Sequence, residues 1–140
     1  MVLAGVLGGC IDYLEPDVGP PTAPRCVNDD SDTSKTVSFS VDIQPIFFNK
    51  CRFCHYPSTT GVPIGIATSH LDLSSYQALR AGGNAGAEIV AGMPCASILF
   101  QKVGPGPPFG SRMPLSGPPF LDDASIQLIH DWIAEGTLAN

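Results

Sequence analysis

The chain has 140 residues, of which 44% are apolar and 14% are charged, so it can fold around one core and is not a disordered tail. Its net charge is −6 and no cluster of Lys or Arg occurs, which argues against a nucleic-acid partner because phosphate binding needs a concentrated basic surface. Fifteen Gly and 14 Pro predict short helices separated by long loops.

Residues 1–10 form a short apolar run that closes on small residues, as at the end of a secretory signal peptide. Leu7-Gly8-Gly9-Cys10 is similar to the lipobox of bacterial lipoproteins, in which the cysteine is lipidated. No Lys or Arg precedes Cys10, so an ordinary apolar N-terminus with a stray cysteine stays an alternative. The run is too short to span a bilayer, which takes roughly 20 apolar residues. We expect a periplasmic or other extracytoplasmic lipoprotein, anchored to the membrane at Cys10.

Residues 11–36 carry four Pro, five Asp and one Glu without apolar periodicity, which predicts an acidic, Pro-rich tether. The folded domain is expected to span 37–140. Three short helices are predicted in it, at 42–51, 74–81 and 97–103. Ser40 or Asp42 can cap the first of them.

The clearest helix is predicted near the C-terminus. Asp122 can cap its start and Gly136 can end it. Its apolar positions follow helical spacing: Ile126, Ile129, Trp132 and Ile133. No stretch alternates with period two, so the fold class is predicted to be all-α.

Between the last two predicted helices lies a segment rich in Pro and Gly, residues 104–119, that fits neither a helix nor a strand. Proline restricts the unfolded backbone, which lowers the entropy lost when the loop takes one shape. Such a loop suits the presentation of one side chain at a fixed place.

The run Cys51-Arg52-Phe53-Cys54-His55 has the Cys-x-x-Cys-His pattern of covalent c-type haem attachment. Two thiols three positions apart can each form a thioether to the haem, and the next residue can turn its imidazole to the iron from the same side. The motif occurs once, so we expect one covalent haem c. A zinc site, a thioredoxin-type dithiol and a surface disulfide are the competing interpretations, although no second ligand pair and no βαβ pattern supports them.

About 100 residues resemble class I c-type cytochrome domains, of the monohaem kind found in secreted and lipid-anchored bacterial proteins. The resemblance lies in residues 39–47, in the cysteine pair with His55, in Ser111-Arg112-Met113-Pro114-Leu115 and in the terminal helix. It implies a small class I cytochrome c fold, and it implies that Met113 is the sixth ligand of the iron, opposite His55. It also implies that the first and last helices cross, with Phe47 and Trp132 at or near one contact.

Other residues compete with Met113 for the iron. Met93 also precedes a proline, and His70 and His130 are further possibilities. A methionine can also simply fill a gap in a core.

Apolar residues expected to line a haem pocket are Ile46, Phe47, Leu99, Phe100, Ile129 and Trp132. The five cysteines also predict a disulfide. Cys10 is assigned to lipid, and Cys51 and Cys54 are assigned to haem. The two cysteines left, Cys26 and Cys95, are expected to pair in an oxidising compartment.

These features predict an electron carrier rather than an enzyme, because both axial positions of the iron would be filled by the protein. Its partners would then be redox proteins. Two other functions stay open: a structural or docking subunit of a membrane electron-transfer complex, and a haem sensor or enzyme whose sixth ligand can be displaced.

Overall fold

The computed structural model describes residues 26–140. The expected signal segment, the lipidation of Cys10 and the tether up to residue 25 lie outside these described residues. Within residues 26–140 the chain forms helices and no strand, which confirms the all-α prediction. The elements are the π-helical turn η1 (Phe39–Ile43), α1 (Gln44–Lys50), α2 (Arg52–His55), α3 (Ile64–Ser69), α4 (Tyr76–Ala81), the 3-10 helix η2 (Pro94–Ala96), α5 (Ile98–Val103) and α6 (Asp123–Ala134).

The first predicted helix is present, but it begins earlier than expected and its cap is a different residue. Ser38 caps η1 by accepting a hydrogen bond from the Val41 backbone N–H (3.3 Å). Asp42 returns the interaction by accepting from the Ser38 N–H at 2.8 Å, which is the reciprocal capping arrangement. Ser40 cannot serve as the cap, because it lies inside the turn and donates its N–H to the Asn140 carbonyl.

The later helices begin and end close to the predicted positions. Ser75 caps α4 by accepting from the Ala78 N–H, and Gly82 follows its last residue. Asp122 caps α6 by accepting from the Ser125 N–H at 2.7 Å. Gly136 lies just beyond α6 with φ +94°, a left-handed conformation that glycine adopts without a Cβ penalty.

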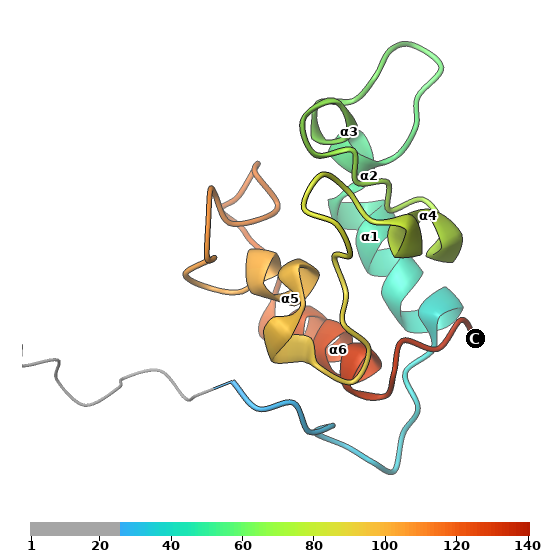
Figure 1. Cartoon of the computed structure of the whole chain (residues 1–140), viewed down its shortest axis with the longest axis vertical. Helices are drawn as coiled ribbons and strands as arrows, with labels where there is room; N and C mark the ends of the chain where they lie inside the picture. The colour runs from blue at the N-terminus through green and yellow to red at the C-terminus, as the bar shows by residue number, and fades with distance from the viewer. Residues whose placement is uncertain (1–25) are drawn as a thin grey trace, which may run out of the picture.

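A cluster of aromatic rings joins the two ends of the folded domain. The ring of Phe39 lies 5.4 Å from the ring of Trp132 and 6.4 Å from that of Phe47. Tyr76 completes the cluster, with its ring 5.4 Å from Phe39. Phe47 and Trp132 therefore both contact Phe39, and η1 packs against α6. Figure 1 shows the start of α1 and the C-terminus close together, with α5 beside α6.

Residues 26–36, which the sequence assigns to the tether, contain no helix or strand, and they contact the helical part of the domain. Cys26 forms a disulfide with Cys95, with 5.7 Å between the Cα atoms. The carboxylate of Asp131 accepts hydrogen bonds from the backbone N–H (3.1 Å) and the hydroxyl of Ser31. In Figure 1 this segment runs beneath α6. Polar contacts with α6 hold the segment in place. The sequence prediction relied on apolar periodicity, which does not detect polar contacts of this kind.

None of the helices within residues 26–140 combines the length and the apolar character needed to cross a membrane.

Candidate functional site

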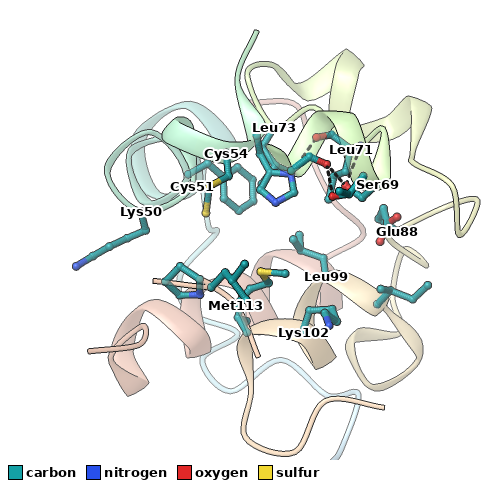
Figure 2. Close-up of a pocket in the computed structure, with 18 of the residues that line it drawn as sticks. Lys50, Cys51, Cys54, Ser69, Leu71, Leu73, Glu88, Leu99, Lys102 and Met113 are labelled. Atoms are coloured by element: carbon teal, nitrogen blue, oxygen red, sulfur yellow. Dashed lines mark hydrogen bonds between the residues drawn. The ribbon is translucent and has the colours of Figure 1, made fainter. Parts of the chain in front are cut away.

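A cavity of about 450 Å³ collects the residues singled out by the Cys-x-x-Cys-His motif and the Pro-rich loop. Cys51, Cys54 and His55 line it from the end of α1 and from α2, and Met113 lines it from the loop after α5. Figure 2 shows Cys51 and Cys54 on one wall, with Met113 on the opposite wall. A cavity of this volume lies within the range of roughly 300–1,000 Å³ usual for cofactor sites.

The imidazole of His55 is oriented by a backbone carbonyl. Its Nδ1 lies 3.0 Å from the oxygen of Leu71, which can only accept a hydrogen bond. Nδ1 therefore carries the proton of the neutral ring, and the lone pair is on Nε2. An acceptor behind one ring nitrogen is the usual arrangement for a metal-binding histidine, because it fixes both the tautomer and the ring orientation.

Gly65 of α3 packs directly against this imidazole. A Cβ at position 65 would lie 2.7 Å from both Cε1 and Nε2 of His55, and 2.5 Å from the carbonyl oxygen of Cys54. Both distances are shorter than real Cβ contacts, so a glycine is required for α3 to pack this closely on α2. The ring is thus confined by Gly65 on one side and oriented by Leu71 through Nδ1.

Cys51 and Cys54 are free thiols, and Cys51 is a poor nucleophile in the folded protein. Burial, with a smaller contribution from nearby Cys54, raises the pKa of the Cys51 thiol to about 11. At neutral pH the thiol is therefore protonated, whereas thioredoxin-type dithiols depend on a lowered pKa. The raised pKa of Cys51 argues against the redox-dithiol interpretation.

The zinc interpretation has no supporting ligand set in the part of the chain that the structure describes. There, no group of three or more His, Cys, Asp or Glu side chains is arranged to hold a metal ion. Protein zinc sites use three or four such ligands.

Met113 is half-buried and is held by contacts between its loop and the end of α5. Its backbone N–H donates to the Lys102 carbonyl at 2.8 Å. The ammonium of Lys102 donates to the carbonyls of Phe109 (2.7 Å) and Ser111 (2.6 Å). Arg112 donates from Nε to the Val103 carbonyl at 2.8 Å. These four bonds attach the loop to the end of α5 at Met113 and at the residues just before it, as expected for a loop that presents one side chain.

The three rivals of Met113 do not line the cavity. Met93 is 45% exposed at the start of η2. His70 ends α3 in a left-handed conformation and pairs with Asn84. His130 is buried elsewhere, between the carboxylate of Asp131 and the Val27 carbonyl.

The pocket residues expected from the sequence divide into two groups. Phe47, Leu99 and Ile129 line the cavity, whereas Ile46, Phe100 and Trp132 do not. Phe100 faces away and packs edge-on against His130, with 5.2 Å between the rings. Trp132 is fully buried in the aromatic cluster and donates from Nε1 to the Leu138 carbonyl. Helical geometry explains the correction at Ile46 and Phe100, because adjacent positions such as 99 and 100 point about 100° apart.

Gly65, Lys102 and Glu88 are among the cavity residues that no sequence pattern indicated. Glu88 is the most unusual of them, because it is a carboxylic acid with only 6% exposure. Burial raises the pKa of Glu88, and the positive charge of Lys102 offsets part of that effect. A glutamate between Ala87 and Ile89 in a loop carries no local signal of burial, so only the tertiary contacts reveal it.

Comparison of the chain with protein-family models, with curated proteins and with solved structures gives no match.

Proposed function

We propose that this protein is an electron carrier, a monohaem cytochrome of the class I type. Its single haem c would be bound through thioethers to Cys51 and Cys54, with His55 and Met113 as the axial ligands of the iron. One observation carries the proposal: two free thiols, an imidazole with its Nε2 lone pair available and a methionine line the same cavity. Met113 comes from a distant part of the chain, so the Cys-x-x-Cys-His motif alone does not account for its position.

The residues present fit a large, flat, apolar cofactor. Apolar side chains line much of the cavity, among them Phe47, Leu99 and Ile129. Gly65 leaves the space beside His55 that a bulkier residue would fill. A bound haem would supply one-electron chemistry at its iron.

The chain itself would set the conditions for that chemistry. His55 would hold one face through Nε2, kept in the right tautomer by Leu71. Met113 would offer a soft, neutral sulfur, which favours the ferrous state and raises the reduction potential. With both positions filled, no open site is left for a substrate, which supports an electron carrier over an enzyme or a sensor.

The cellular setting belongs to the same proposal. A structural disulfide such as Cys26–Cys95 is typical of an oxidising compartment, which supports a periplasmic or other extracytoplasmic location. Lipidation of Cys10 would hold the protein at the membrane, near redox protein partners or as part of a larger electron-transfer complex.

The direct test is expression in a host that attaches c-type haem, followed by a denaturing gel stained for haem and by intact mass. We expect a haem-sized mass increase in wild type, none in the double variant Cys51→Ser/Cys54→Ser, and a normal increase in the control variant Cys26→Ser/Cys95→Ser. Wild-type protein that weighs only its polypeptide and lipid would overturn the proposal. Carbon monoxide then separates the carrier from a sensor: rapid binding to the reduced protein at neutral pH would contradict ligation by Met113.

A further inference from the structure

Among the described residues that line the cavity, Glu88 is the one carboxylic acid. Its side chain is almost completely buried, with 6% exposure, and lies against the backbone of Gly83. Figure 2 shows Glu88 on the wall of the cavity beyond Leu99, in the same space as Met113. A buried carboxyl group in an apolar cavity normally has a hydrogen-bond or charge partner, because its ionised form is costly to desolvate.

The oxygens of the Glu88 carboxylate face the open space of the cavity, and they form no hydrogen bond or ion pair in the described part of the chain. The one ion pair there joins His130 and Asp131. The factors that set the pKa of Glu88 are burial and the charge of Lys102, with no hydrogen bond among them. The ammonium of Lys102 is itself occupied by two loop carbonyls. No hydrogen bond or ion pair therefore fixes the Glu88 carboxyl group in one protonation state, and a new charge in the cavity can change that state.

None of the other described ionisable groups around Glu88 forms a hydrogen bond or ion pair with its carboxylate. Those lining the cavity are Lys50 at the end of α1, Cys51, Cys54 and His55 at α2, and Lys102 on α5. His70 at the end of α3 is engaged with Asn84. The Cys51 thiol is neutral at physiological pH, since its pKa is about 11.

A redox centre in this cavity would change the electrostatic environment of Glu88 by one charge. An oxidised centre carries one more positive charge than a reduced one, and this charge favours the carboxylate over the carboxylic acid. In a poorly polarisable cavity that preference is stronger than in water. Because linkage is reciprocal, a proton bound at Glu88 favours the reduced centre by the same factor.

We propose that Glu88 is a redox-linked proton site, which binds a proton when the centre gains an electron and releases it on oxidation. This inference rests on the proposed electron-transfer function. In the reducing step, one electron arrives from a one-electron donor protein and one proton from water converts the Glu88 carboxylate into the carboxylic acid. In the oxidising step both leave, so the protein carries a hydrogen equivalent rather than an electron alone.

The test is a redox titration of the haem-loaded protein across pH 4–9, with Glu88→Gln and the control Asp123→Asn, an exposed acid in the first turn of α6. Between the two pKa values of Glu88, the wild-type potential should fall by up to about 59 mV per pH unit, since a tenfold change in an equilibrium constant corresponds to that shift for one electron. Asp123→Asn should keep this slope and Glu88→Gln should lose it. A wild-type potential independent of pH in this range, or an unchanged slope in Glu88→Gln, would overturn the inference.

A second measurement does not depend on whether Glu88→Gln folds. The reduced-minus-oxidised infrared spectrum of the wild type should contain the carbonyl band of a protonated carboxylic acid, and Glu88→Asp should keep this band at a shifted position. Absence of any such band from the wild type rejects the proton site. Protein without covalent haem would instead reject the proposed function, so the two failures are distinguishable.

Discussion

Replacing Gly65 by alanine tests how closely α3 confines the imidazole of His55. The new Cβ would lie 2.7 Å from Cε1 and Nε2 of the ring and 2.5 Å from the Cys54 carbonyl oxygen, whereas ordinary contact begins at 3.4 Å. The oxygen belongs to the backbone of α2 and cannot rotate away. To restore ordinary contact, α3 must therefore separate from α2 and from the ring by about 0.7 to 0.9 Å.

Two opposing effects set the magnitude. Overpacking typically destabilises by about 1–3 kcal/mol, and alanine is favoured over glycine inside a helix by up to about 1 kcal/mol. We expect a net loss of about 1–2 kcal/mol in the free energy of unfolding, which lowers Tm by about 4–8 °C for a chain of this length. Displacement of His55 should also shift the reduction potential of the haem-loaded protein.

Thermal unfolding followed by circular dichroism measures the loss, and Gly104→Ala is the matched control. Gly104 has φ −72°, and a Cβ there would be no closer than 3.5 Å to any neighbour. Gly104→Ala should therefore unfold close to the wild-type Tm. If Gly65→Ala matches wild type in both Tm and reduction potential, the reasoning about the packing of α3 on His55 is wrong.

Met113→Ala should lower the reduction potential and admit carbon monoxide to the reduced protein, whereas the exposed Met93→Ala should do neither; similar carbon monoxide binding by both would contradict the ligand assignment. Glu88→Gln should stabilise the reduced protein at neutral pH, because burial raises the folded-state pKa of Glu88 and so penalises its ionised form. That gain should vanish below the unfolded-state pKa of about 4.3, and urea unfolding at several pH values measures it; a gain that persists at low pH would refute this reason. Replacing Cys26 and Cys95 together by serine should lower the free energy of unfolding by up to about 4 kcal/mol in the chain-entropy model. Denaturant unfolding tests this, and an unchanged midpoint would show that the bridge contributes nothing to stability.

Local signals were sufficient to predict some elements and not others. Asp122, the spacing of the apolar residues and Gly136 define α6 within the sequence itself, and the structure agrees. α3 was missed because it has only six residues, and its Ile64-Gly65-Ile66 start has a low helix propensity. Packing against α2 supports it instead.

In the candidate site, too, some features could be predicted from local sequence and others depend on tertiary contacts. Cys51, Cys54 and His55 are adjacent in the sequence, so their pattern could be recognised without a structure. The bond from His55 to Leu71 and the burial of Glu88 arise from contacts between separate segments, and no local pattern marks them. Apolar character predicted that Trp132 is buried, but not that it packs in the aromatic cluster rather than at the cavity.

The protonated state of the Cys51 thiol has a consequence for how the mature molecule is made. In the folded chain Cys51 is partly buried, and burial raises the pKa of its thiol to about 11, so its reactive thiolate is scarce at physiological pH. Any covalent bond to Cys51 therefore forms most readily on a chain that is still open. Assembly would then follow a fixed order, with sulfur chemistry during biogenesis and compaction of the helices afterwards.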